Sequence, residues 1–171
     1  MILSWISFTI LLTYVIWTTT KYGIPVSLSQ TYYHIPRGFL FTLTIWICNF
    51  LIIPQAMDMT GDIKIIPFLG IMGSMLVGAA PRVRDEDRTV HNIGAIVSAV
   101  FSQIFVAVYG NPWSMLAWIP ALFLLAVSIK FDPRELRRPG LEAKIDTVRL
   151  VFWCEMICYF TLYTSLLGEG I

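Results

Sequence analysis

The chain has 171 residues, of which 57% are hydrophobic and only 13% are charged, and its mean hydropathy is +0.72. An ordinary soluble domain is about one quarter charged, so this composition excludes a soluble globular protein. The net charge of +1 gives no electrostatic reason to expect a nucleic-acid partner. We therefore expect an all-α, polytopic membrane protein whose partners are membrane lipids.

Six apolar segments follow one another along the chain, most of them close to the roughly 20 residues that a membrane-spanning helix needs. The expected spans are residues 2–20, 38–57, 65–80, 91–109, 112–129 and 147–167. They leave no room for a soluble domain, so residues 1–171 are expected to form a single transmembrane domain. The first segment has neither a positively charged start nor a clear cleavage site, which predicts a retained span rather than a signal peptide. Pro120 lies in the middle of the fifth segment and predicts a kink there.

Positive charge is distributed unevenly between the two ends of these spans. The connections after the first, third and fifth spans carry all but one of the 12 Lys and Arg residues, the exception being Lys64. Cytoplasmic loops carry the excess of Lys and Arg in membrane proteins. The distribution therefore predicts a six-helix transmembrane bundle with both termini outside.

Small residues recur at every fourth position on the third and fourth spans. Membrane helices associate through close backbone packing, which small side chains permit. We therefore expect these two spans to form a close hairpin, joined by the charged run at residues 82–88. The small positions are Gly70, Ser74 and Gly78 on the third span, and Gly94, Ser98 and Ser102 on the fourth.

The first connection contains a pattern typical of a helix start. Ser27 is followed three residues later by Gln30, which is the spacing of a capping box. The pattern predicts a short helical turn that begins at Leu28.

Glu155 is the one carboxyl inside an otherwise apolar span. It lies six residues beyond Arg149, and therefore about 9 Å deeper along a helix, near the middle of the bilayer. An ionised carboxyl facing lipid at that depth costs roughly 2.5 kcal/mol or more, so we expect the side chain to face the interior of the bundle. Polar residues expected at a similar depth are Asn49, Ser74, Ser98 and Ser102, with His91 above them at the cytoplasmic mouth.

This polar cluster has two interpretations. In the first, Glu155, Asn49, Ser98, Ser102 and His91 form a site that binds or transports a small ligand or a proton. In the second, the protein has a structural or accessory role, and the same groups only make hydrogen bonds between helices, each worth under about 1 kcal/mol. The two three-helix halves show no internal repeat, which weakens a transporter interpretation.

A third interpretation is a membrane-embedded enzyme that acts on lipid through His91, Asp85 and Asp87. We do not favour it, because no nucleophile elbow, zinc-protease motif or phosphate-binding loop is present, and we assign no catalytic residue. The chain has two histidines, and its three cysteines lie inside apolar segments. This set supplies too few ligands for a metal centre, so we expect no metal and no cofactor.

Two segments resemble parts of a group of small multi-span membrane proteins, of uncharacterised function, from Bacteroidetes-type bacteria and their phages. The segments are YGIPVSLSQTYY (Tyr22–Tyr33) and VGAAPRVRDEDRTVHNIGA (Val77–Ala95). The resemblance implies a multi-pass protein of the bacterial inner membrane and carries no activity with it. The sequence leaves open whether the chain acts alone, as a homo-oligomer or with a partner membrane protein.

Overall fold

The computed structural model describes residues 1–80, 85–129 and 149–168. Every regular element among these residues is a helix, which confirms the expected all-α class. The α-helices are α1 (Ile2–Tyr22), α2 (Thr31–His34), α3 (Phe39–Met59), α4 (Ile65–Ala79), α5 (Asp85–Tyr109), α6 (Trp118–Ile129) and α8 (Leu150–Gly168), and the 3₁₀ helices are η1 (Leu28–Gln30) and η2 (Pro112–Ala117).

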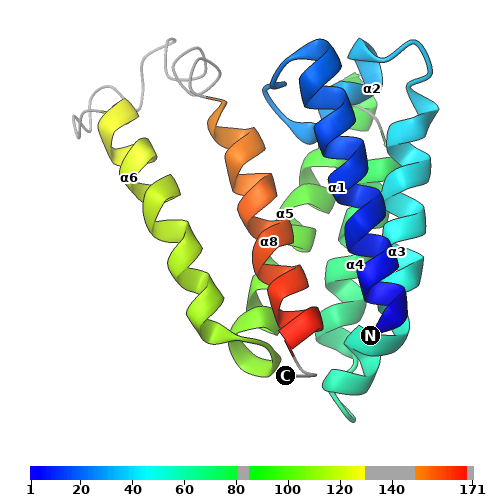
Figure 1. Cartoon of the computed structure of the whole chain (residues 1–171), viewed down its shortest axis with the longest axis vertical. Helices are drawn as coiled ribbons and strands as arrows, with labels where there is room; N and C mark the ends of the chain where they lie inside the picture. The colour runs from blue at the N-terminus through cyan, green and yellow to red at the C-terminus, as the bar shows by residue number, and fades with distance from the viewer. Residues whose placement is uncertain (81–84, 130–148, 169–171) are drawn as a thin grey trace.

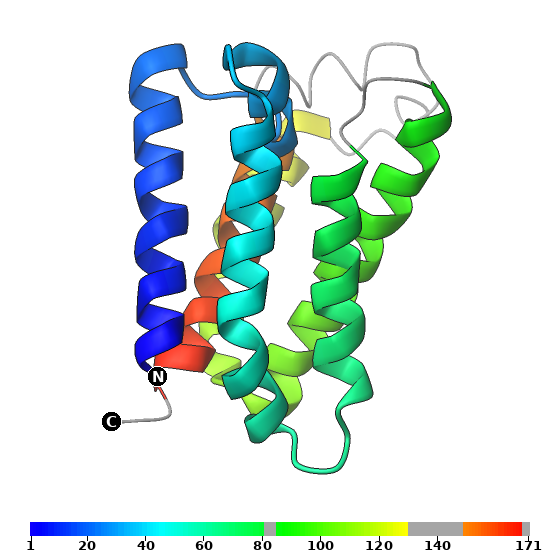
Figure 2. The same ribbon diagram turned by 90° about the vertical axis from the view of Figure 1, so that its right-hand side faces the viewer.

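The long helices run alternately up and down (Figures 1 and 2). Helices α1, α4 and α6 end at the same end of the bundle at which α3, α5 and α8 begin. The start of α1 and the end of α8 lie together at the opposite end. This alternation brings the helix ends that flank the three connections rich in Lys and Arg to one end of the described bundle.

Among the described residues, four helical segments are long and apolar enough to cross a membrane, as expected of a membrane protein. They are α1, α3, residues Thr89–Tyr109 of α5, and α8. Two further apolar helices, α4 and Pro112–Phe123, are shorter. At 1.5 Å per residue, the 15 residues of α4 extend about 22 Å, which is less than the ~30 Å of hydrocarbon in a bilayer.

The closest helix pair is the α4–α5 hairpin, as the small residues predict. A Cβ atom built on Gly73 would lie 2.6 Å from the backbone nitrogen of Ser98 and 2.7 Å from the carbonyl oxygen of Gly94. A Cβ on Gly94 would in turn lie 2.8 Å from the carbonyl oxygen of Gly73, and one on Gly70 would lie 3.3 Å from the nitrogen of Ser102. The two backbones therefore touch along a seam that no larger side chain could occupy.

The seam departs from the predicted one at Ser74 and Gly78, which face α3 instead of α5. Ser74 accepts a hydrogen bond from Asn49 on α3, and a Cβ on Gly78 would lie 3.0 Å from the ring of Trp46 on the same helix. With 3.6 residues per turn, positions four apart drift around the helix by about 40° per step. Residues spaced strictly four apart therefore turn away from α5 along α4. Gly73, which does not follow that spacing, occupies the central position of the seam.

Two helix boundaries also differ from those expected. Helix α5 begins at Asp85 rather than at residue 91, so the second half of the charged run belongs to the helix. Acidic residues in the first turn favour helix formation because the helix N-terminus carries partial positive charge. The fifth segment starts as η2, and α6 begins only at Trp118, which places Pro120 in the first turn rather than mid-helix. Proline is tolerated there because the first-turn N–H groups lack helical partners, so the predicted mid-span kink is wrong.

Polar side chains connect α1, α3 and α8 in the part of the bundle nearest the two termini. The Ser7 hydroxyl on α1 lies 3.0 Å from the Cys48 carbonyl oxygen on α3 and 2.5 Å from the Tyr163 hydroxyl on α8. Gln55 on α3 donates a hydrogen bond to the Leu166 carbonyl on α8. Such bonds are worth about 0.6 kcal/mol each on average, and here they fix the mutual rotation of three helices.

Candidate functional site

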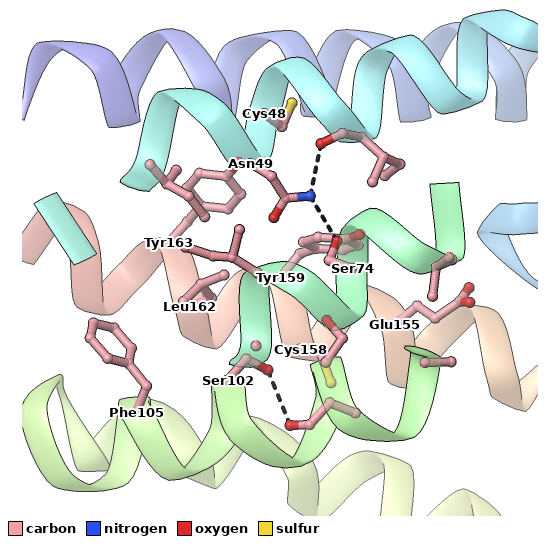
Figure 3. A pocket seen from close by; sticks show the side chains of 18 of the residues that line it. Cys48, Asn49, Ser74, Ser102, Phe105, Glu155, Cys158, Tyr159, Leu162 and Tyr163 are labelled. Carbon is pink, nitrogen blue, oxygen red and sulfur yellow. Dashed lines mark hydrogen bonds between the residues drawn. The ribbon is translucent and has the colours of Figure 1, made fainter. Parts of the chain in front are cut away.

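The bundle encloses a cavity of about 310 Å³ between α3, α4, α5 and α8. Most of its wall is apolar, with Ile52, Ile71, Phe105 and Leu162 among the lining residues. The polar residues predicted to cluster inside the bundle, except His91, do come together here (Figure 3). They are Asn49, Ser74, Ser98, Ser102 and Glu155. The cavity is therefore the candidate site, and its binding role stays a prediction.

Asn49 is held rigidly in the cavity wall. Its amide nitrogen donates to the Ser74 hydroxyl oxygen and to the Ile45 carbonyl oxygen, both at 2.8 Å. Its side-chain amide therefore has both donor hydrogens in use, and only 7% of the residue is exposed. The remaining polar atom, the amide oxygen, points to the interior of the cavity in Figure 3. Asn49 can accept a hydrogen bond from a bound molecule but has no hydrogen left to donate.

The two serines on α5 play a weaker polar role than Asn49. The Ser102 hydroxyl donates to the carbonyl of Ala99 at 3.1 Å within its own helix, so its hydrogen is already used. Ser98 lines the cavity next to the seam, where its backbone nitrogen would meet any Cβ on Gly73. The small size of the serine side chain therefore explains why serine occurs at both positions. The two hydroxyl oxygens add weak hydrogen-bond acceptors to the cavity wall.

Glu155 has a specific backbone partner in the structure. The backbone nitrogen of Leu28 donates to Glu155 Oε2 at 2.5 Å. The side-chain stem of Glu155 lines the cavity, while Figure 3 shows its carboxyl group at the edge, directed away from Cys158 and Tyr159. The first connection therefore folds onto α8 and supplies a donor to this carboxyl group, which the sequence did not predict, while its depth in the membrane stays a prediction.

The first connection forms the predicted turn with an unexpected cap. A 3₁₀ turn begins at Leu28 as the capping-box pattern predicts, but Ser27 makes no side-chain capping bond. The acceptor for the first N–H of the turn comes from Glu155, which is 127 residues away in the chain. An oxygen of the Glu155 carboxyl group therefore takes the place that a local capping side chain would have.

A second hydrogen bond joins the same connection to α8. The backbone nitrogen of Phe152 donates to the carbonyl oxygen of Val26 at 3.0 Å. The side-chain oxygen of Gln30 accepts from the Val26 nitrogen at 3.1 Å and so fixes the bend of the connection. Together with the Glu155 bond, these contacts fasten the first connection to the start of α8.

His91 lies outside the cavity wall. Its Nδ1 atom is 3.0 Å from the carbonyl oxygen of Ala80, and 6% of the residue is exposed. It therefore joins α5 to the end of α4. His91 lies one turn before Ala95, which does line the cavity, so its place above the polar cluster stays a prediction.

The acidic residues of the enzyme interpretation cannot be positioned around His91. The side chains of Asp85 and Asp87 lie outside the described residues. Within the described part of the chain, no group of three or more His, Cys, Asp or Glu side chains could hold a metal ion.

The cavity opens sideways between α5 and α8. Ile96 on α5 and Val151 on α8 both line it, and they are 63% and 40% exposed. Further along the same helices lies a polar junction that the candidate set omitted. Gln103 on α5 donates to the Thr161 hydroxyl at 3.0 Å and accepts from the Trp118 indole nitrogen at 2.9 Å. Among the described residues, the exposed lining side chains of Ile96 and Val151 place an opening of the cavity on the outer surface of the helices.

Comparisons of the chain with protein-family models, curated proteins and solved structures found no match.

Proposed function

We propose that this chain is a membrane protein that binds a small, neutral and mainly apolar molecule, such as part of a lipid chain, in the cavity between α3, α4, α5 and α8. The observation that carries the proposal is the cavity itself, which is mostly apolar, has few polar groups and opens sideways toward lipid. Binding sites for small molecules are typically concave and apolar with a few placed polar groups. A ligand that already resides in the bilayer would enter through the gap beside Ile96 and Val151.

The polar residues of the wall would orient such a ligand. The Asn49 amide oxygen would accept a hydrogen bond from a hydroxyl or amide group, with Ser98 and Ser102 beside it. Glu155 would close the end of the cavity through its bond to Leu28 and would not carry a proton or a charge to the ligand.

A structural or accessory role is the second candidate, and one observation favours it. Both donor hydrogens of Asn49 are used inside the protein. In that case the polar wall would serve helix association only, and the cavity would hold no specific molecule.

A photoreactive lipid analogue separates the two candidates. A long-chain fatty alcohol carrying a diazirine in mid-chain would be irradiated with the protein in membranes, and the modified peptides would be identified by mass spectrometry. We expect adducts on the cavity residues of α4 and α8, such as Ile71 and Leu162. Ala99→Phe places a ring in the cavity and should reduce these adducts about tenfold, which corresponds to a loss of about 1.4 kcal/mol in binding free energy.

The matched control is Ala107→Phe on the same helix. Ala107 is exposed and is not part of the cavity wall, so the same ring there should leave the adducts unchanged. Adducts confined to exposed residues such as Phe160, or equal yields from both variants, would support the structural role instead.

We also propose that the chain forms six spans in the bacterial inner membrane with both termini outside. The proposal is supported by the bias of Lys and Arg toward three connections and by the alternating helix directions in Figure 1. Reporter fusions after Gly110 and at Ile171 should both report an external location. A cytoplasmic signal from either fusion would mean that α4 or α6 does not cross the membrane.

A further inference from the structure

A second hollow of about 120 Å³ lies where the first connection meets the end of α1 and the start of α8. None of its lining residues belongs to the wall of the larger cavity. Its polar lining residues are Thr18, Tyr22, Gln30, Thr31, His34 and Arg149. We call this hollow the basic crevice, because Arg149 and His34 are the ionisable groups other than Tyr22 among its lining residues.

The basic crevice offers several hydrogen-bond donors. Its lining residues within 1–80, 85–129 and 149–168 include no Asp or Glu. The oxygen of the Gln30 side chain already accepts a bond from Val26, which leaves the NH₂ group of Gln30 as a donor. A guanidinium, an imidazole and an amide NH₂ group in one hollow suit an anion with several oxygen atoms, and Arg in particular matches the geometry of phosphate.

Arg149 is placed in the basic crevice by the start of α8. Its backbone lies in the left-handed region at φ 52°, which is uncommon for a residue other than glycine. It directly precedes Leu150, the first residue of α8, so it sits at the end of the helix that carries partial positive charge. The helix dipole and the guanidinium therefore favour an anion at the same place.

Aromatic residues indicate that the basic crevice lies at the level of lipid headgroups. Trp17, Tyr22 and Tyr33 surround the end of α1, and Tyr33 is 47% exposed. The Lys21 ammonium lies 5.9 Å from the centre of the Trp17 ring and 5.4 Å from that of Tyr22. Trp and Tyr are enriched at membrane–water interfaces, with Lys and Arg beyond them, so phosphate groups of the bilayer lie within reach of this hollow.

We propose that the basic crevice binds a phosphate-bearing anion, through Arg149, His34 and Gln30, and that its source is the headgroup of an anionic phospholipid. The proposal is independent of any ligand in the larger cavity. Free phosphate has the same chemistry, so the test includes it as a separate arm.

The test measures thermal unfolding of the full chain in neutral-detergent micelles during titration with phosphatidylglycerol, phosphatidylcholine or inorganic phosphate. We expect phosphatidylglycerol to raise the midpoint temperature of unfolding until the effect saturates. Phosphatidylcholine should change the midpoint little. Stabilisation by inorganic phosphate at similar concentrations would support the site and make free phosphate its source. A wild-type chain that responds to neither phosphatidylglycerol nor phosphate would overturn the proposal.

Charge variants test whether the basic crevice is the place of binding. Arg149→Gln should weaken the apparent affinity for phosphatidylglycerol at least about fivefold, and Arg149→Lys should weaken it less. Arg37→Gln removes the same charge at the same end of the bundle from an exposed residue outside the crevice, and should leave the affinity unchanged. An equal loss in Arg37→Gln and Arg149→Gln would mean diffuse surface attraction and would overturn the site. His34→Gln gives an independent check within the crevice if Arg149→Gln does not fold.

Discussion

Gly73→Ala is expected to lower the free energy of unfolding by about 1–3 kcal/mol, although it adds a single methyl group. The new Cβ atom would lie 2.6 Å from the Ser98 nitrogen and 2.7 Å from the Gly94 carbonyl oxygen. Both neighbours are backbone atoms of α5, so no side-chain rotation can relieve the collision. The α4–α5 hairpin would have to separate, and the cavity wall that the two helices share would change with it.

Thermal unfolding in detergent micelles measures this effect, and Gly168→Ala provides a matched control. Gly168 is the last residue of α8, and a Cβ atom there would have no neighbour within 4 Å. The control should unfold within a degree or two of the wild type, while Gly73→Ala should unfold clearly earlier. Equal midpoints for the two variants would contradict the close backbone contact.

Glu155→Leu is expected to cost about 1–3 kcal/mol, the usual penalty for leaving a buried donor without its partner. Leucine has a similar volume but no acceptor, so the Leu28 N–H would lose its partner in a partly buried position. Glu155→Gln keeps an oxygen at the same place and should lose less than half as much stability. The order of stability should therefore be wild type, then Gln, then Leu.

The loss should also be local to the first connection. Hydrogen exchange at the Leu28 amide should accelerate strongly in Glu155→Leu, while exchange within the α4–α5 hairpin should change little. If Glu155→Gln and Glu155→Leu were equally destabilised, or if exchange rose evenly over the bundle, the capping role of Glu155 would be wrong.

The helices could be predicted well from the sequence because the bilayer imposes their length. Backbone polar groups must be paired within each segment in hydrocarbon, so an apolar run of sufficient length becomes a helix. The predicted span 38–57 corresponds to α3 (Phe39–Met59), and the span 147–167 corresponds to α8 (Leu150–Gly168). The starts of helices were less predictable. Helix α5 begins at Asp85, before its apolar run, and α6 begins only at Trp118, so that Pro120 falls in its first turn.

The candidate site could be predicted only in part. Asn49, Ser98 and Ser102 share the cavity with Glu155, because polar residues avoid lipid and so face the interior of the bundle. The partner of Glu155 could not be predicted, since it is a backbone nitrogen in a connection that the sequence places at the surface. His91 is not part of the cavity wall, since its ring contacts the Ala80 carbonyl at the end of α4.

The contacts between helices were also hard to predict from the sequence, both in the α4–α5 seam and in the polar network between α1, α3 and α8. Gly73 does not fit the strict four-residue spacing, although spacings of three and four both keep a residue on one helix face. Ser7 and Tyr163 lie on separate helices, 156 residues apart in the chain. Only the rotation of each helix, which packing decides, reveals that the two side chains meet.

The central claim is that an apolar molecule from the bilayer occupies the cavity beside Asn49. A density map of the protein, extracted from native membranes without detergent and held by a rigid antibody fragment, tests it most directly. We expect elongated density that enters between Ile96 and Val151 and ends near the Asn49 amide oxygen, and we expect it to be absent in Ala99→Phe. An empty cavity in the wild type, with the same helix positions as in Ala99→Phe, would contradict the claim.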